Sequence, residues 1–126
     1  ILYPFDFEAD HLCICEGPSD AISLNLQGLN ATCTIGSTIS HVQMQTLREF
    51  EGEIILTYDN DEAGRRGIEK LENLRKKYMM PTFSICTPPE KYKDWNEAHI
   101  KNEDLASWVK NKKYEYTFEN RALNLL

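Results

Sequence analysis

The sequence predicts an α/β fold in which a central, mainly parallel, four-stranded sheet is flanked by helices on both faces. Short apolar, β-prone runs alternate with segments of helical periodicity four times along the 126 residues, and the connections are long enough to hold crossover helices. The run "EIILTY" at 53–58 is the most apolar of these, as expected for a strand buried on both faces of a parallel sheet. Such sheets bind ligands outside the carboxyl ends of their strands.

Each element is predicted from this alternation and from the residues that interrupt it. The strands are predicted at 11–15, 31–36, 53–58 and 82–86. The helices are predicted at 18–28, 40–51, 61–78 and 104–112. Pro18 suits a first helical turn and Gly28 a left-handed cap, while Ser40 and Gln43 have the spacing of a capping box.

The helix predicted at 61–78 is amphipathic. Its inward face combines Gly64, Gly67, Ile68, Leu71, Leu74 and Tyr78. Its outward face combines Glu69, Lys70, Glu72, Arg75 and Lys76. The two glycines would let this helix approach the sheet closely. After the fourth strand, residues 87–99 begin as a loop, and a short helix is expected within 121–126.

One domain is expected at 11–112, with a lead-in at 1–10 and a tail at 113–126, because no repeat, low-complexity linker or internal boundary divides the chain. The first residue is Ile1, so we expect a fragment of a longer multidomain protein. No apolar run reaches the roughly 18 residues of a membrane span, and no secretory signal opens the chain.

Charge and cysteine content narrow the class of protein. The net charge of −6 argues against tight, autonomous binding to nucleic acid, which depends on Lys and Arg, but it leaves room for contact through a bound metal. The four cysteines form no C-x-x-C pair and have no histidine at zinc-finger spacing, so no zinc is expected in this chain. All lie in predicted strands, and we expect buried, free thiols in a reducing cytoplasm.

Carboxylates follow three of the predicted strands. Glu16 comes directly after the first strand, and Asp20 lies one helical turn further on. Asp59 and Asp61 follow the third strand, and Asp94 follows the fourth. Because these strand ends share one edge of the sheet, the acids are expected to repel one another there unless a cation lies among them. Mg²⁺ fits best, since it is held by one or two carboxylates, water and phosphate, although helix capping is the alternative for such acids.

The motif "DNDEAG" at 59–64 has three other interpretations, and its neighbours argue against each. A calcium EF-hand loop that starts at Asp59 needs an oxygen ligand and a glutamate where the chain has Ala63 and Lys70. A haloacid-dehalogenase-type phosphatase usually has this motif on its first strand, with threonine or valine in place of Ala63. A response-regulator receiver domain needs adjacent acids after the first strand, where Glu16 is followed by "GPSD".

In combination, "CICEGPSDAISL", "TIGS", "ILTYDNDEAGRRG" and "KDWNEA" resemble the Toprim domain that bacterial primases, type IA and II topoisomerases and some nucleases share. The resemblance covers residues 11–99. The segments "DEAGRR" and "KDWNE" are most similar to primases and primase–helicases of phages, plasmids and other mobile elements. The resemblance implies the Toprim, Rossmann-like form of the α/β fold.

The resemblance also implies roles for individual residues. Glu16 corresponds to the family's general acid/base or metal ligand, and Asp59 and Asp61 to its catalytic, metal-binding pair. Asp94 corresponds to a further ligand, and Asn96 stands where many primases have a second aspartate, so it brings a ligand oxygen without charge. The supporting residues are Asp20, Gly17 and Gly64.

Residues beside these acids are candidates for contacts with nucleotide phosphates. Arg65 and Arg66 can present bidentate forks and Lys93 a point charge. The alternative for both arginines is to neutralise the acids around them. Gly36 and Ser37, between a predicted strand and a helix, could offer backbone N–H groups to phosphate.

Together these inferences predict a magnesium-dependent DNA primase-type nucleotidyltransferase that makes RNA primers, with Mn²⁺ as a possible substitute. The expected partners are single-stranded DNA template, nucleoside triphosphates and other domains of the same chain (a zinc ribbon or a helicase), without a membrane. The fragment alone is expected to be weak or inactive. Two alternatives keep the fold: phosphodiester chemistry as in Toprim nucleases or topoisomerases, and non-catalytic binding of nucleic acid or partner proteins.

Overall fold

The computed structural model describes residues 2–34, 39–117 and 119–120. Its strands are β1 (His11–Cys15), β2 (Ala31–Cys33), β3 (Glu53–Leu56), β4 (Ser84–Ile85) and β5 (Tyr114–Glu115). Its helices are α1 (Pro18–Leu26), α2 (His41–Glu49), α3 (Glu62–Lys77), α4 (Trp95–Ile100) and α5 (Leu105–Lys112). No helix in the described ranges combines the length and the apolar character needed to cross a membrane.

The strands form one sheet in the order β2-β1-β3-β4-β5. β1 is parallel to both β2 and β3, and β3 is parallel to β4, whereas the edge strand β5 is antiparallel to β4. The chain passes from β1 to β2 on one side and resumes with β3 on the other, so the strand order reverses between β1 and β3. At such a reversal a crevice opens outside the carboxyl ends of the strands.

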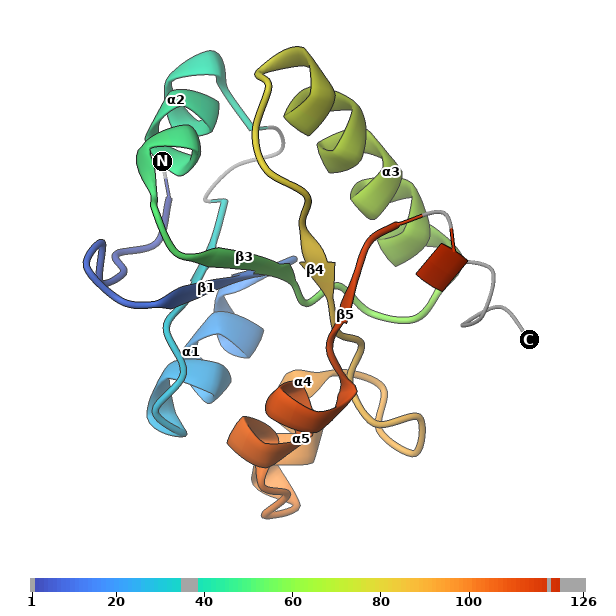
Figure 1. Cartoon of the computed structure of the whole chain (residues 1–126). Coiled ribbons are helices and arrows are strands. Elements are labelled where there is room, and N and C mark those ends of the chain that lie inside the picture. Colours follow the sequence, from blue (N-terminus) through green and yellow to red (C-terminus); the bar gives the residue numbers. More distant parts are fainter. Residues whose placement is uncertain (1, 35–38, 118, 121–126) are drawn as a thin grey trace.

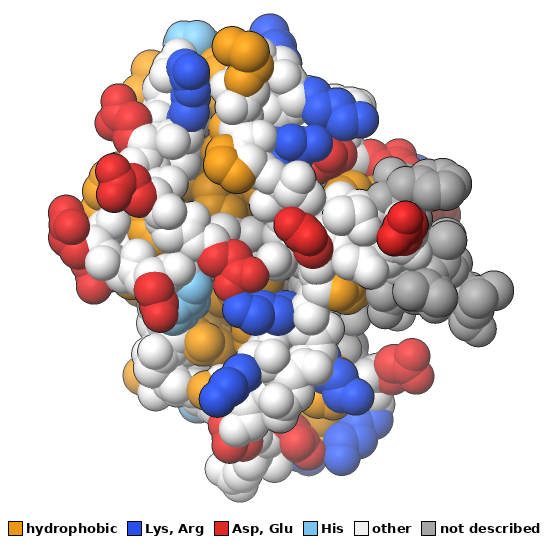
Figure 2. Space-filling view, in the orientation of Figure 1, with side chains coloured by type: hydrophobic (Ala, Val, Ile, Leu, Met, Phe, Trp, Pro, Cys, Tyr) orange, Lys and Arg blue, Asp and Glu red, His pale blue; other side chains and the backbone are white. Residues whose placement is uncertain are grey.

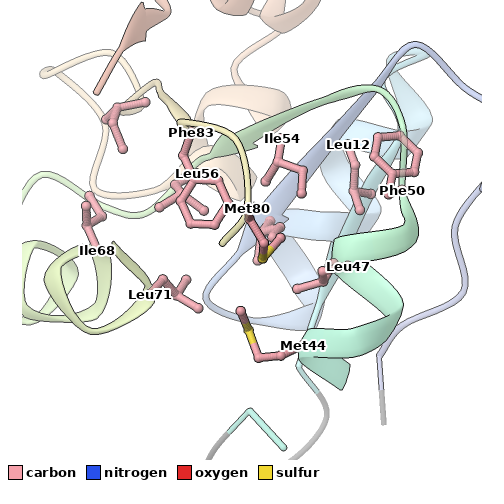
Figure 3. Packing of buried hydrophobic residues seen from close by; sticks show 12 residues of the cluster. Leu12, Met44, Leu47, Phe50, Ile54, Leu56, Ile68, Leu71, Met80 and Phe83 are labelled. Carbon is pink, nitrogen blue, oxygen red and sulfur yellow. The ribbon is translucent and has the colours of Figure 1, made fainter. Parts of the chain in front are cut away.

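Helices cover both faces of the sheet, with α2 and α3 on one face and α1, α4 and α5 on the other (Figure 1). Successive side chains of a strand point to opposite faces, so the sheet contributes side chains to two hydrophobic clusters, one on each face. Leu12, Ile54 and Leu56 pack with residues of α2 and α3 in the first cluster (Figure 3). Cys13 and Ile55 pack with residues of α1, α4 and α5 in the second. The predicted two-sided α/β architecture is therefore confirmed.

The cysteines belong to the second cluster. All four are free and buried, as the sequence predicts. Burial raises the pKa of the Cys13 and Cys86 thiols to about 12. These thiols are therefore uncharged at neutral pH and act as small apolar side chains.

Several helix boundaries follow the predicted signals. The Ser40 side chain accepts the backbone N–H of Gln43, and the Gln43 side chain accepts the backbone N–H of Ser40 at 2.8 Å, which completes the capping box. Pro18 is the first residue of α1. Gly28, just beyond α1, has φ +85°, as expected for a left-handed cap.

Several features differ from the prediction. β3 and β4 are shorter than the strands predicted at 53–58 and 82–86. The sheet has a fifth strand, β5, whose two residues are too few to show an alternating pattern. Helix α4 replaces part of the predicted loop and has six residues, fewer than two turns, so no periodicity indicates it. Glu72, predicted to point outward, is 8% exposed and pairs with Arg75. The helix expected within 121–126 lies outside the described residues.

Candidate metal centre

Glu16 and Asp59 meet where the strand order reverses. Glu16 directly follows β1, and Asp59 lies just beyond the end of β3. The backbone N–H of Asp59 donates to Oε1 of Glu16 at 2.7 Å. Thr57 holds the two strand ends together, because its backbone N–H and its hydroxyl both donate to the carbonyl of Ile14, at 2.9 and 3.0 Å.

The carboxyl group of Asp59 lies among the other acids. Its Oδ1 is buried and has no hydrogen-bond partner among the described residues. The pKa of Asp59 is raised to about 7 by burial and then by the charges of its acidic neighbours, which are Glu16, Asp20, Asp61 and Asp94. The fold thus brings together the five acids singled out in the sequence. A desolvated carboxylate oxygen without a donor is unfavourable, and a cation would relieve it.

Asp20 and Asn96 connect α1 to α4. Asp20 is 7% exposed, and its Oδ1 accepts the backbone N–H of Asn96 at 3.0 Å. Burial raises the pKa of Asp20, the bond from Asn96 opposes this rise, and the charges of Asp94 and Glu16 add to it. Oδ1 of Asn96 accepts the hydroxyl of Ser23 at 3.1 Å. The Ser23 hydroxyl also donates to the carbonyl of Ser19 at 2.9 Å, so its single proton is shared and the amide oxygen of Asn96 keeps a lone pair for a further partner.

Asp61 and Asp94 each cap a helix. Oδ1 of Asp61 accepts the backbone N–H of Gly64 at 2.7 Å at the start of α3. Oδ1 of Asp94 accepts the backbone N–H of Glu97 at 2.8 Å at the start of α4. A carboxylate has two oxygens and about four lone-pair sites, so a cap uses only part of its capacity and is compatible with metal binding.

The two supporting glycines differ in what the fold asks of them. A Cβ at Gly64 would lie 1.9 Å from the carbonyl oxygen of Asp59, so α3 can approach the end of β3 only with glycine here. At Gly17, by contrast, nothing lies within 4 Å of the Cβ position. The chain itself therefore leaves open space above Gly17, next to Glu16.

Trp95 anchors the segment that carries Asp94. Its side chain is fully buried, and Nε1 donates to the carbonyl of Thr57 at 2.8 Å. Because Thr57 lies between β3 and Asp59, this bond connects the start of α4 to the acidic edge, which is the sheet edge where the five acids, Glu16 and Asp59 among them, gather. An indole without exposed surface cannot stack on a base, so Trp95 acts by position.

A pocket of about 270 Å³ opens beside the acids. Its lining consists of Asp59, Asn60, Asp61, Pro88, Glu90, Tyr92 and Lys93. Among the predicted phosphate contacts, Lys93 is therefore the one placed in this pocket. Gly36 and Ser37 lie outside the described residues.

Arg65 and Arg66 are exposed in the first turns of α3. Nη1 of Arg65 donates to Oδ1 of Asn60 at 3.5 Å. Nη1 of Arg66 donates to Oε1 of Glu62, also at 3.5 Å. Contacts this long between exposed side chains are weak, so both guanidinium groups stay available to a phosphate.

Comparison with known proteins identifies the family. Residues 13–99 match the family model described as Toprim-like. The chain belongs to the Toprim-like family. The DNA primase of Thermotoga maritima is 30% identical over 115 residues, which are 86% of this chain and 20% of that protein. The chain spans 12% to 20% of the length of the curated DNA primases that it matches.

Solved primase structures share the Toprim fold of this chain. The Aquifex aeolicus primase, with its zinc-binding and RNA polymerase domains, aligns with a TM-score of 0.72 over 88% of this chain and 27% of that one, at 24% identity. A DnaG primase catalytic domain bound to single-stranded DNA aligns with a TM-score of 0.69 over 83% and 34% of the two chains, at 23% identity. The predicted Toprim fold and the relationship to primases are therefore confirmed.

Toprim domains are generally magnesium-binding, and the acidic edge of this one fits the ion. Asp59 supplies a buried oxygen that lacks a partner among the described residues, and all candidate ligands are oxygen atoms. In the part of the chain that the structure describes, no three His, Cys, Asp or Glu side chains converge closely enough to hold a metal. Mg²⁺ needs only one or two carboxylates when water and phosphate complete its shell, so an open site at Asp59 suits it.

Motif analysis of the Toprim acids missed several neighbours of the site. Asn60 is the central residue of the "DND" motif, and its position alone could have singled it out. Pro88, Glu90 and Tyr92 reach the pocket through a loop whose course no local pattern specifies. Ser23 meets Asn96 across 73 residues of sequence, which only the packing of α1 against α4 reveals.

Proposed function

We propose that this chain is the Toprim catalytic domain of a DNA primase or primase–helicase, which joins nucleotides into RNA primers on single-stranded DNA with Mg²⁺ as cofactor. The state of Asp59 carries the proposal: its pKa is raised to about 7, and its Oδ1 is buried without a partner among the described residues. Strongly shifted carboxyl groups in a crevice are typical of functional sites. The match to curated DNA primases favours nucleotidyl transfer as the reaction.

The contacts of the acids suggest how they divide the work. Asp59 and Asp61 would hold the metal, with Asp94 as a further ligand from α4. When bound, Mg²⁺ would neutralise charge on the transferred phosphoryl group and orient the attacking 3′-hydroxyl. Glu16 is exposed and fixed by the N–H of Asp59, so it is placed to accept a proton from that hydroxyl.

The remaining residues hold the acids or meet the substrate. Asp20 accepts the backbone N–H of Asn96, and this bond keeps the start of α4 beside α1. Asn96 positions α4 through this backbone bond, and its amide oxygen, which faces the shared hydroxyl of Ser23, would serve as an uncharged ligand of the metal. Lys93 lines the acidic pocket and is placed to contact a nucleotide phosphate. Arg65, whose Nη1 contacts Asn60 of the pocket lining, is a second candidate cation.

The wider assignments belong to the same proposal. They comprise single-stranded DNA template and nucleoside triphosphates as partners, a zinc ribbon or helicase domain in the same protein, Mn²⁺ as a substitute, a mobile-element origin and a cytoplasmic location. The relatives with bound single-stranded DNA and with a zinc-binding domain support the first two. Because the chain spans so little of its relatives, we expect synthesis only when the other domains are present.

Primer synthesis by the full protein that carries this chain tests the proposal. With template, nucleoside triphosphates and Mg²⁺, we expect Glu16→Gln and Asp59→Asn each to lower synthesis by about a hundredfold or more. Glu69→Gln, an exposed acid on the outer face of α3, is the matched control and should keep full activity. Addition of Mg²⁺ should shift the NMR signals around Asp59 and Asp61 in the wild type and leave those of Asp59→Asn unchanged.

The same experiments separate the two alternatives. DNA cleavage without synthesis, lost in Glu16→Gln and Asp59→Asn, would indicate a Toprim nuclease. A non-catalytic Toprim module is favoured by the absence of three converging ligands among the described residues. It predicts neither activity and no Mg²⁺-dependent signal shifts. Full synthesis in both variants contradicts the catalytic assignment.

A further inference from the structure

A second groove lies beside the acidic pocket, between α5 and the loop that follows β4. Its volume is about 450 Å³, and its lining includes Pro88, Pro89, Lys91, Trp108, Lys112 and Tyr114. Pro88 and Glu90 line both this groove and the acidic pocket. The two hollows are therefore neighbours that share part of their lining.

The charge around the groove differs from that of the whole chain. The charged residues that line the groove are Lys91, Lys112 and a single acid, Glu90, although the net charge of the protein is −6. Figure 2 shows Lys and Arg side chains beside apolar surface in the lower part of the molecule, with Asp and Glu side chains among them, where Figure 1 places α5. A local excess of cations beside apolar surface favours an anionic ligand with flat, apolar groups.

Trp108 has a fixed orientation in the groove. Its Nε1 donates to the carbonyl of Thr87 at 2.8 Å, and the side chain is half-buried against the second hydrophobic cluster. Nζ of Lys112 lies 5.5 Å from the centre of the Trp108 ring. The groove thus holds a rigid aromatic ring below a flexible cation.

We propose that this groove binds a short stretch of single-stranded nucleic acid, with a base stacked on Trp108 and phosphates held by Lys91 and Lys112. Stacking of a base on an aromatic side chain stabilises a complex by about 1–3 kcal/mol, whereas an exposed cation–π contact contributes about 0.5–1 kcal/mol. A base therefore displaces the Lys112 ammonium from the ring. The freed ammonium then reaches a phosphate of the same strand.

Lys91 has two contacts in the absence of a ligand, one with Glu103 and one with the ring of Tyr92, whose centre lies 5.2 Å from Nζ of Lys91. Its Nζ lies 3.2 Å from Oε1 of Glu103, and its side chain is 68% exposed. An exposed ion pair of this kind contributes little, so a phosphate can replace the Glu103 carboxylate. Glu90 is the acid among the residues that line the groove. Its carboxylate, which also lines the acidic pocket, repels phosphates on that side of the groove.

The identity of the strand as the template rests on the proposed function, but its binding does not. The groove contains none of the five acids around Asp59, so we expect binding without divalent metal. A titration in EDTA therefore tests the groove, and primer synthesis tests the catalytic site. If the wild type makes primers but does not bind the strand in EDTA, the proposed groove is wrong and the proposed function stands. If it binds the strand but makes no primers, the proposed function is wrong and the groove stands.

The two tryptophans make the titration specific. Trp95 is fully buried and Trp108 lines the groove, and the chain has no third. We expect a dodecamer of deoxythymidine to quench the intrinsic fluorescence of the 126-residue chain, with a dissociation constant of about 10⁻⁴ to 10⁻⁵ M at low salt. An abasic dodecamer with the same phosphates should bind more weakly and quench little, because it has no base to stack.

Fluorescence anisotropy of a labelled dodecamer compares the variants. Lys112→Gln should weaken binding about fivefold and reduce the slope of log affinity against log salt by about 0.7, the loss of one phosphate contact. Trp108→Leu should weaken it about tenfold, and Glu90→Gln should strengthen it. Lys77→Gln is the matched control, because Lys77 also lies over a ring, 5.9 Å from the centre of Tyr78, at the opposite end of the molecule from α5 (Figure 1).

Two results would overturn the proposal. The first is equal affinity of Lys112→Gln and of the wild type for the labelled dodecamer. A groove that binds a protein segment instead of nucleic acid predicts the same result. The second is equal quenching by the abasic and the normal dodecamer, which excludes stacking on Trp108. Because Lys112 is an exposed surface residue, its variant is expected to fold, and the first result is decisive even if Trp108→Leu is unstable.

Discussion

The backbone N–H of Asp59 donates to Oε1 of Glu16 at 2.7 Å, and this bond joins the ends of β1 and β3 where the strand order reverses. The two residues are 43 positions apart in the sequence. After burial, the charge of Glu16 is the largest contribution to the raised pKa of Asp59. One contact therefore sets both the geometry of the acidic edge and the protonation of its central carboxyl group.

Replacement of Glu16 by glutamine is expected to lower the pKa of Asp59 from its value of about 7. The amide oxygen can accept the same backbone bond, while the repelling charge is gone. NMR titration of the Asp59 carboxyl carbon in metal-free protein measures the change. Glu90→Gln is the control, since Glu90 lines the same pocket but is not among the groups that shift Asp59. An unchanged pKa in Glu16→Gln would contradict the coupling.

Replacement of Asp59 by asparagine should stabilise the metal-free fold at neutral and alkaline pH. The pKa of Asp59 rises from 3.8 to about 7 on folding. Between these values the folded state binds the proton more strongly, so wild-type stability falls as pH rises from about 4 to about 7. We expect Asn to remove this fall, which amounts to about 1–2 kcal/mol once screening of the partly exposed group is allowed for. Urea unfolding at pH 5 and pH 8 in EDTA measures it.

Magnesium is expected to reverse the order of stability of the wild type and Asp59→Asn. It should raise the midpoint of thermal unfolding of the wild type at pH 8, because a ligand that binds only the folded state stabilises it. Asp59→Asn should show no such rise.

Equal pH dependence of the two proteins in EDTA would mean that Asp59 is ionised without penalty in the folded state.

The acidic edge was predictable because Glu16 and Asp59 lie near strand ends and a parallel sheet brings such ends together, whereas Asp94 reaches it through a loop and the start of α4. Asp59 and Glu16 needed only the mainly parallel sheet that the alternation of elements predicts, while the order of its strands comes from the structure. The use of each oxygen was not predictable. The bond between Ser23 and Asn96 depends on the packing of α1 against α4, which leaves no trace in the local sequence.

Other parts of the fold escaped prediction because their patterns are short or depend on distant partners. β5 has two residues and α4 has six, too few for a period to be read. Glu72 lies on the polar side of α3 by helical spacing, yet it forms a two-bond pair with Arg75 at 2.6 and 2.8 Å. Arg75 also donates to the carbonyl of Met80 at 2.9 Å, so the turn after α3 helps to bury the pair.

Gly64→Ala is expected to damage both the fold and the site. The new Cβ would lie 1.9 Å from the carbonyl oxygen of Asp59, so either α3 or the Asp59 backbone must move, at about 2–3 kcal/mol. Gly17→Ala is the matched comparison, because nothing lies within 4 Å of its Cβ and only the N-cap preference for glycine at the start of α1 is lost, at about 0.5–1 kcal/mol. Urea unfolding measures both. Equal stability of the two variants would contradict the close approach of α3.

Asp61 is expected to have separable capping and metal-binding roles. Asp61→Ala removes the cap of α3 and should reduce stability by about 1 kcal/mol, whereas Asp61→Asn keeps a capping side chain and should stay near wild-type stability. Both should weaken Mg²⁺ binding, as followed by NMR shifts of the Asp59 region. Asp104→Ala, which removes the corresponding cap of α5, should cost similar stability without affecting Mg²⁺. If Asp61→Asn binds Mg²⁺ like the wild type, Asp61 is only a cap.

Trp95→Phe is expected to weaken Mg²⁺ binding at the candidate metal centre, although Trp95 is not one of the predicted ligands. The change removes the 2.8 Å bond from Nε1 to the carbonyl of Thr57 and leaves a buried acceptor unpaired, at about 1–3 kcal/mol. Because this bond ties Asp94 to the end of β3, Mg²⁺ affinity should fall as well, which calorimetric titration can follow. Trp108→Phe is the matched control, since it loses an equal bond of 2.8 Å to the carbonyl of Thr87 in the neighbouring groove. A loss of Mg²⁺ affinity in Trp108→Phe as large as that in Trp95→Phe would mean that general destabilisation, rather than the anchoring of Asp94, accounts for the effect.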